Sequence, residues 1–194
     1  MHEGREETAV YTGWHFTATA TEGRDGWPLK AVEELPKGTK PVLCKVGLHA
    51  CENPLDALRY APGSFVRRVE LRGTVLADGD KACGTERVTL AGPVDASRVL
   101  REFACACAER ALLREREVGR EPDPRSWAAI EVARRYARGE ATVEELATAR
   151  SAAWAAAVGS AAWAWSAAAS AAAEREWQEA ELTRRLRELL GTEQ

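Results

Sequence analysis

Chemically reactive side chains are densest between residues 44 and 56. His49 and Cys51 are two positions apart, so on a β-strand their side chains would share one face. Cys44 and Cys83 would complete the four ligands of a zinc site, but the chain has no C-x-x-C pair and the spacing matches no zinc knuckle. We favour thiols that are buried as small apolar groups, and we expect no metal.

A nucleophilic pair of Cys51 and His49 is an alternative use of the same two side chains. Such a pair needs hydrogen-bond donors that stabilise an oxyanion, and only a helix beginning near Asn53 would supply them. The same helix start would also attract an anionic ligand. Its first backbone N–H groups have no partner within the helix and lie at the positive end of its dipole.

Polar side chains from other segments would contact a ligand placed there. His15 lies among aromatic residues, and Lys81 follows two aspartates in a turn-like segment. Structural roles compete with binding: His15 would be a hydrogen-bonded core residue, His49 and Asn53 would hold the turn and cap the helix, and the aspartates would form a solvated hairpin. The candidate ligand-binding residues are His15, His49, Cys51, Asn53, Asp78, Asp80, Lys81 and Glu86.

Composition narrows the function classes. The chain has 194 residues, a formal net charge of −3 and 45% hydrophobic residues, which is typical of a protein with one or two small domains. The near-neutral charge disfavours nucleic-acid binding. A Walker loop, a dinucleotide fingerprint, HExxH and GxSxG are all absent from the sequence, so we expect no cofactor and identify no catalytic set.

Cysteine usage and hydropathy predict a cytoplasmic protein. Five cysteines, an odd number, do not make a disulfide framework in a chain of this size. Residues 1–8 lack the apolar core of a signal peptide, and the low-charge stretch 151–173 is rich in alanine rather than leucine. We therefore expect neither export nor a membrane span.

The first half of the chain has the pattern of short strands joined by turns. Strand-like segments rich in β-branched and aromatic residues lie at 10–17, 41–44, 64–72 and 86–90. One short helix is expected between them, because Asn53 suits the N-cap, Pro54 suits the first turn and Pro62-Gly63 would end it. Residues 1–94 are thus predicted to form an α+β domain with a small mixed sheet that carries the candidate site.

After Pro93, apolar residues recur every three or four positions, which predicts an all-helical domain over residues 95–194. Helices are expected at about 99–119, 127–139 and 142–190. Thr142 and Glu145 match a capping box at the start of the third helix. This helix would be long and rich in alanine and tryptophan, and Gly159 is the place where it would break.

The alanine-rich stretch contains a near-repeat, since Ser-Ala-Ala-Trp at 151–154 recurs at 160–163. Trp154 and Trp165 share one helical seam with small residues, while Trp163 and Trp177 lie off it. Two apolar faces exceed what one small domain would cover, so we predict a homo-oligomer, a dimer or larger. An exposed alanine helix held by propensity alone is the alternative.

The ordered motifs carry a family resemblance. GLHAC-x-NPLDAL-x-YAPG at 47–63, a strand at 69–73 and a Gly-Asp-Lys turn at 78–81 resemble a domain of unknown function that is common in phage and bacterial genomes. The alanine/tryptophan-rich tail resembles the extension of the same phage proteins, sometimes named immunity proteins. The resemblance implies a phage-type accessory protein in the host bacterial cytoplasm. It implies no chemistry, and the family's adjacent aspartates are here separated by Gly79.

A looser similarity, in the order of elements alone, connects residues 47–71 with the ADP-ribosyltransferase fold. It implies that His15 would contact the nicotinamide side of a ligand and that Glu86 would be the catalytic acid. The aromatic residue that this fold carries after its second strand is missing here.

Three hypotheses of function follow. The first is a phage-type accessory protein, with a role such as anti-defence, that binds a small nucleotide-like ligand or a host protein without catalysis. The second is an ADP-ribosyltransferase-like or other nucleotide-processing enzyme. The third is a structural or protein-interaction module.

The tryptophan seam generates a test of self-association. Replacing Trp154 and Trp165 by Glu places charges on the seam, so the double variant should be a monomer when its mass is measured by light scattering. A wild-type protein that is itself monomeric at high concentration would contradict the prediction.

Overall fold

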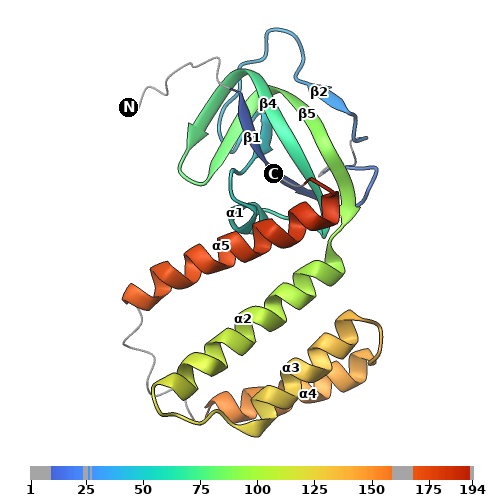
Figure 1. The fold of residues 1–194 in the computed structure, drawn as a ribbon. Coiled ribbons are helices and arrows are strands. Elements are labelled where there is room, and N and C mark those ends of the chain that lie inside the picture. The colour runs from blue at the N-terminus through green and yellow to red at the C-terminus, as the bar shows by residue number, and fades with distance from the viewer. Residues whose placement is uncertain (1–9, 24–25, 27, 159–167, 193–194) are drawn as a thin grey trace. The chain divides into compact units, whose positions relative to one another are not determined.

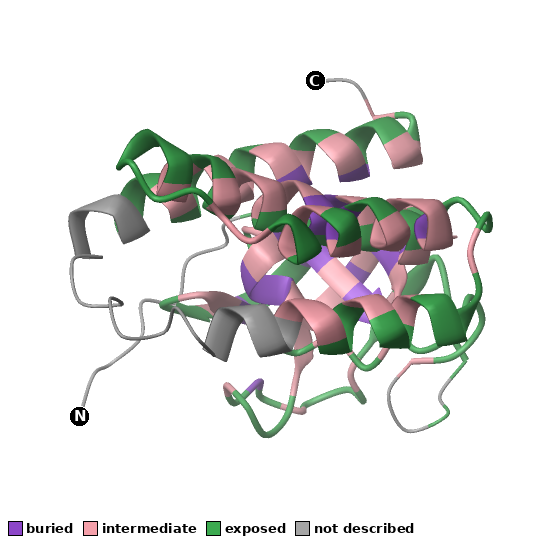
Figure 2. Cartoon of the chain, turned by 90° about the horizontal axis from the view of Figure 1, so that it is seen from below, coloured by how far each residue is buried: buried purple, intermediate pink, exposed green. Residues whose placement is uncertain are grey.

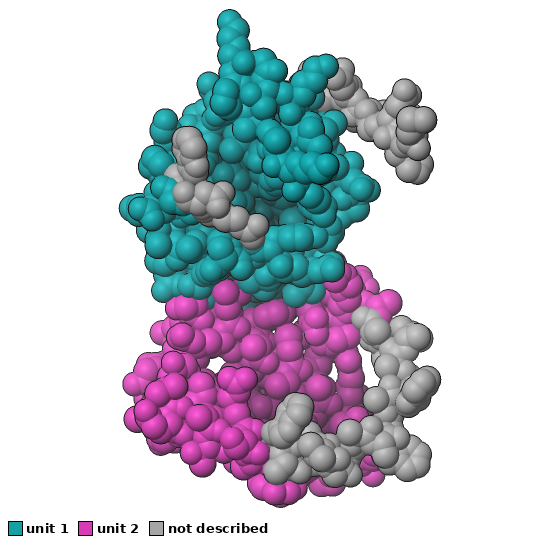
Figure 3. Space-filling view, turned by 180° about the vertical axis from the view of Figure 1, so that it is seen from behind, with its two compact units in different colours: residues 1–96, 179–194 teal, residues 97–178 magenta. Residues whose placement is uncertain are grey.

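A computed structural model of the chain describes residues 10–23, 26, 28–158 and 168–192. By internal contacts, the chain divides into two compact units, residues 1–96 with 179–194 and residues 97–178, coloured separately in Figure 3. The first holds a β-sheet and a short helix, and the second holds helices. The α+β class is confirmed, while the division at residue 94 stays a prediction.

A single sheet contains the described strands of the first unit. The strands are β1 Tyr11–Thr17, β2 Val32–Glu34, β3 Leu48–Ala50, β4 Phe65–Asp78 and β5 Lys81–Asp95 (Figure 1). Their order is β1-β4-β5-β2, and β3 also pairs with β5. Residues 41–44, predicted as a strand, form only a bridge from Val42 to Val46.

The described strand pairs are all antiparallel, which corrects the prediction of a mixed sheet. Between β4 and β5, Gly79 and Asp80 are the only connecting residues. Such a turn joins antiparallel strands, because a parallel crossover needs a dozen residues or more. The predicted hairpin at 78–81 is confirmed.

A backbone bridge joins β1 to the residue that follows β3, so the sheet curls back on itself. The Trp14 N–H donates to the Cys51 carbonyl at 2.7 Å, and the Cys51 N–H donates to the Trp14 carbonyl at 3.1 Å. Gly13 permits this approach, since a Cβ there would lie 2.7 Å from the Cys51 oxygen. The closure brings His49 and Cys51 beside β1.

Helix α1, Pro54–Leu58, begins as the sequence predicts. The Asn53 side chain accepts a hydrogen bond from the Leu55 N–H at 2.8 Å, and Pro54 occupies the first turn. Asn53 is therefore a helix cap in this structure.

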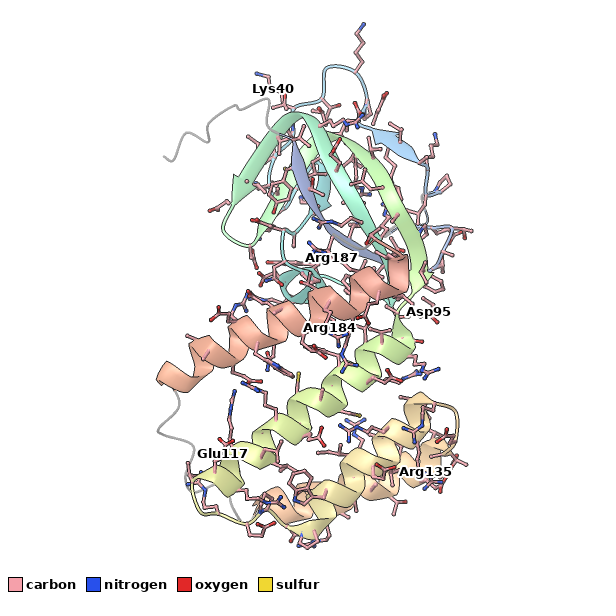
Figure 4. The ribbon with its side chains drawn as sticks, in the orientation of Figure 1. Lys40, Asp95, Glu117, Arg135, Arg184 and Arg187 are labelled. Carbon is pink, nitrogen blue, oxygen red and sulfur yellow. The ribbon has the colours of Figure 1, made fainter. Side chains whose placement is uncertain are left out.

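The sheet unit has an apolar core and a helical covering segment. The core cluster comprises Ala50, Val69, Leu71, Val75 and Ala82. Leu182 and Leu186, in the second half of α5 (Ala168–Leu190), are fully buried. Arg184, labelled in Figure 4, lies on the same helix and pairs with Glu181 and Glu188. Residues 179–194 belong to this unit, so the end of the chain adds two fully buried leucines to it.

The second unit contains α2 Ser97–Glu117, α3 Pro124–Ala137 and α4 Val143–Val158. The capping box is confirmed, because the Thr142 N–H donates to the Glu145 carboxylate at 2.7 Å and the Glu145 N–H donates to the Thr142 hydroxyl at 3.2 Å. Few described residues of these helices are buried, as the colours of Figure 2 show.

The side chains of Trp154 and Trp165 are not among those that the structure describes, and Gly159 lies outside the described residues. Self-association and the break in the long helix therefore stay predictions. Among the helices that the structure describes, none is both long and apolar enough to cross a membrane.

The burial of Leu186 generates a test of the packing. Leu186→Ala should lower the free energy of unfolding by about 2–5 kcal/mol, since it removes apolar contacts and leaves a cavity. Leu90→Ala is the matched control in the same unit, because Leu90 is 49% exposed. Urea unfolding followed by circular dichroism measures both. Equal midpoints for the two variants would show that α5 contributes nothing to this core.

Candidate functional site

A cavity of about 590 Å³ lies in the sheet unit. Residues from β1, β2, β3, β5 and α1 line it, together with the loop before β3. Its polar lining includes His15, Glu33, Lys45, His49, Lys81 and Arg87, and its aromatic lining includes Trp14, Phe16 and Tyr60.

Strand geometry explains why these polar residues meet. Alternate residues of a strand share a face, so Lys81, Arg87 and Thr89 of β5 point to the same side. Glu33 lies directly opposite Arg87 on β2, and His15 lies opposite Arg67 on β4. Residues opposite one another across a strand pair also share a face. Four strands, β1, β2, β4 and β5, thereby contribute side chains to one polar cluster.

Glu33 stands between two buried arginines. Arg87 holds both carboxylate oxygens, with Nε 2.9 Å from Oε2 and Nη2 3.1 Å from Oε1. Arg67 Nη1 lies 2.8 Å from Oε2. The Arg67 side chain is fully buried and that of Arg87 is 7% exposed. Separating Glu33 from these arginines would leave buried charges without a partner, so the cluster holds β2 against β5.

The same guanidinium groups also bind neutral partners. Arg67 Nη1 donates to the Thr89 hydroxyl at 3.0 Å, and Arg87 Nη1 donates to the His49 carbonyl at 2.8 Å. Arg67 Nε donates to His15 Nδ1 at 3.2 Å. Because His15 Nδ1 accepts this bond, its imidazole proton lies on Nε2. The cluster therefore sets the tautomer of a histidine that lines the cavity.

The cluster carries an excess of positive charge. Burial lowers the pKa of Arg67, the nearby Arg87 charge lowers it further, and Glu33 opposes both. Burial raises the pKa of Glu33, but the hydrogen bonds and charges of Arg87 and Arg67 outweigh burial and lower it overall. Two guanidinium groups thus face one carboxylate. Arg67 Nη2 is buried with no hydrogen-bond acceptor among the described residues.

A second polar group lies beside the cavity, where α1 meets the β4–β5 turn. The Tyr60 hydroxyl donates to Asp80 at 3.0 Å, and Arg59 Nη1 lies 3.2 Å from the same carboxylate. The Lys81 ammonium lies 5.2 Å from the centre of the Tyr60 ring, a cation–π contact. Lys81 and Tyr60 both line the cavity, whereas Asp80 is occupied by Arg59 and Tyr60.

Two thiols of the sheet unit, Cys51 and Cys83, are buried and suited to packing. Burial, together with the charges of Asp80 and Asp56, raises the pKa of Cys51 to about 11, so this thiol is protonated at neutral pH. Burial also raises the pKa of Cys83. This protonation disfavours the Cys51–His49 nucleophile. Within the described residues, no group of three or more His, Cys, Asp or Glu side chains is placed to hold a metal ion.

The structure brings together four of the eight predicted site residues. His15, His49, Cys51 and Lys81 all line the cavity. Asn53 caps α1, and Asp78 lies opposite Lys81 at the exposed end of the hairpin.

Asp80 and Glu86 do not line the cavity. Glu86 lies 3.7 Å from Arg72. Because Glu86 immediately precedes Arg87 on β5, the Glu86 and Arg87 side chains point to opposite faces of the sheet. Arg87 therefore lines the cavity, whereas the sequence had suggested the Glu86 carboxylate there. That the eight candidate residues bind a ligand stays a prediction.

Sequence analysis missed Glu33, Arg67 and Arg87. For Arg67 a signal was present: with Val69 and Leu71 facing the core, strand alternation puts Arg67 on the same side, where a charged residue is unusual. Glu33 has no comparable signal in the sequence, because its partners lie 34 and 54 residues away in the chain.

Comparison with known proteins finds one family model that matches part of the chain. Residues 14–102 match the family model of DUF7666, a domain of unknown function. The matched span runs from β1 into α2 and includes the lining residues from Trp14 to Arg87. No curated protein and no solved structure matches the chain.

The Glu33 ion pairs generate a pH prediction. Glu33→Gln should lower the free energy of unfolding at pH 7 by roughly 3 kcal/mol, because it leaves buried guanidinium groups without a counter-charge. The folded-state pKa of Glu33 is lowered, so its contribution is complete above its ordinary value of 4.5 and is lost as the pH falls through the folded-state value. The difference in the free energy of unfolding between wild type and Glu33→Gln should therefore become smaller at acidic pH.

Urea unfolding at a series of pH values measures this difference. Glu34→Gln is the control, because Glu34 is an exposed neighbour on the same strand. A Glu33→Gln difference that stays constant from pH 7 to about pH 3 would contradict the assignment.

Proposed function

We propose that the sheet unit binds a small nucleotide-like anion in the cavity and does not convert it. The observation that carries this proposal is the charge of the lining. Among the residues that line the cavity, Lys45, Lys81 and Arg87 are cationic, and Glu33 is the one carboxylate. An oxyanion placed here gains from these charges: Arg87 is buried, Lys81 is half-buried and Lys45 is exposed.

The size and the walls of the cavity support a ligand that also has a ring. A volume of about 590 Å³ lies within the range of small-molecule sites. Trp14 and Tyr60 contribute aromatic surface, and Leu48 and Pro62 contribute aliphatic surface. A nucleoside monophosphate combines a flat ring with a phosphate, so it fits both parts of the lining.

The lining argues against an enzyme of ADP-ribosyl transfer. Acid–base or oxocarbenium chemistry needs a carboxylate that is available to the substrate. Glu33 is held by both arginines, and Glu86, the carboxylate suggested by fold analogy, does not line the cavity. Binding without conversion is therefore the simpler use of these residues. A purely structural module would not require the cationic lining.

The proposal includes a role for the helices. We propose that the chain acts as a phage-type accessory protein, in which self-association through the Ala/Trp-rich helix brings several ligand-binding units together.

Calorimetric titration with AMP tests the proposal. AMP should bind, and adenosine, which has the same ring and no phosphate, should bind at least about tenfold more weakly, because a charge-assisted contact contributes about 1.5–3 kcal/mol. Lys81→Met should weaken AMP binding by a similar factor. Lys30→Met removes the same charge from an exposed position that does not line the cavity, so it should leave the affinity unchanged.

Mass analysis of the ligand separates binding from catalysis. After incubation with AMP or NAD and denaturation of the protein, intact ligand supports a binding protein, and a converted ligand supports the enzyme. If wild type shows no heat of binding with AMP, the nucleotide proposal is wrong, and intact NAD would then leave the structural module as the function.

A further inference from the structure

We infer that Glu33 is an internal occupant of the oxyanion position on Arg87 and Arg67, and that the phosphate of an incoming nucleotide displaces it and detaches β2 from β5. This inference rests on the proposed function and adds to it the location of the phosphate and a structural response to binding. Glu33 then acts as a competitor built into the chain.

The geometry around Glu33 is that of an anion receptor. Nε and Nη2 of Arg87 contact both carboxylate oxygens in a parallel fork, and Arg67 adds a third contact at 2.8 Å. An arginine fork accepts a carboxylate and a phosphate with the same planar geometry. The group that fills it here belongs to the protein.

Charge favours the exchange. Glu33 brings one negative charge to two guanidinium groups, whereas a phosphate monoester carries up to two at neutral pH. Its three terminal oxygens also supply more acceptors than a carboxylate has. Arg67 Nη2, buried without an acceptor among the described residues, is a donor that the additional oxygen could satisfy.

The strand that carries Glu33 is weakly held apart from this ion pair. β2 has three residues and lies at the end of the strand order β1-β4-β5-β2. Val32 is 44% exposed and Glu34 is exposed, so detachment uncovers little apolar surface. Two flanking backbone bonds continue the pairing, Leu35 N–H to Thr85 and Thr89 N–H to Ala31. Short edge segments of this kind open at low free-energy cost.

A disulfide that fixes β2 in place tests the displacement. Val32 and Val88 lie directly opposite each other, one position from the Glu33–Arg87 pair, and alternation puts them on the face away from the cavity. The Val32→Cys/Val88→Cys variant is made with Cys44→Ser, because Cys44 is an exposed thiol. Mass spectrometry verifies that the new disulfide has formed.

The oxidised variant should bind AMP at least tenfold more weakly than wild type, and reduction should restore the affinity. Val32→Ser/Val88→Ser with Cys44→Ser is the control, and it should bind AMP equally under both conditions. In wild type, saturating AMP should also speed hydrogen exchange of the amides at 31–35.

Each result decides the inference. Equal AMP affinity of the oxidised and reduced forms, or unchanged exchange at 31–35 in the complex, would overturn the displacement while the proposed function stands. A wild type that does not bind AMP would overturn the proposed function, and the displacement with it.

Discussion

The ion pairs of Glu33 with Arg67 and Arg87 are the contact on which the sheet unit depends. They join β2, β4 and β5, and through His15 and the His49 carbonyl they also reach β1 and β3. Two buried cations would be costly without the carboxylate, so Glu33, or another anion in its position, stabilises the assembly of these strands. The same requirement makes the cluster both a structural element and a candidate receptor for anions.

A long central strand makes this arrangement possible. β5 extends over fifteen residues and pairs with β4, β3 and β2 along different parts of its length. One face of a single strand therefore presents both Lys81 and Arg87 to the cavity, and Thr89 on the same face binds Arg67. The bridge between Trp14 and Cys51 then brings β1 and β3 together, so residues of both strands line the same cavity as β5.

The helical unit uses a different means of stabilisation. Its described residues include few that are fully buried, and ion pairs are frequent, such as Arg134 with Glu109 and the two contacts of Glu174 with Arg110 and Arg114. Exposed pairs contribute little individually. Short-range caps and intrinsic helix propensity therefore carry much of the order in α2, α3 and α4. This explains why the start of α4 follows the capping-box pattern of the sequence.

Features that depend on neighbouring residues could be predicted from the amino-acid sequence. The cap of α1 by Asn53, the capping box at Thr142, the hairpin at 78–81 and the α+β class all rest on contacts between residues at most a few positions apart, or on periodicity. Residues 41–44 show the limit of such patterns. Their composition suits a strand, yet the chain there forms a tight bridge within itself.

Only the tertiary structure decided which charged residues meet. Glu86 and Arg87 are adjacent in sequence, and the register of β4, β5 and β2 decides which of them faces the cavity. The partners of Glu33 lie 34 and 54 residues away, and the core position of Leu186 depends on α5 returning to the sheet. Pairings over such distances are set by strand register and by packing across the whole unit. Local propensity contains no information about either.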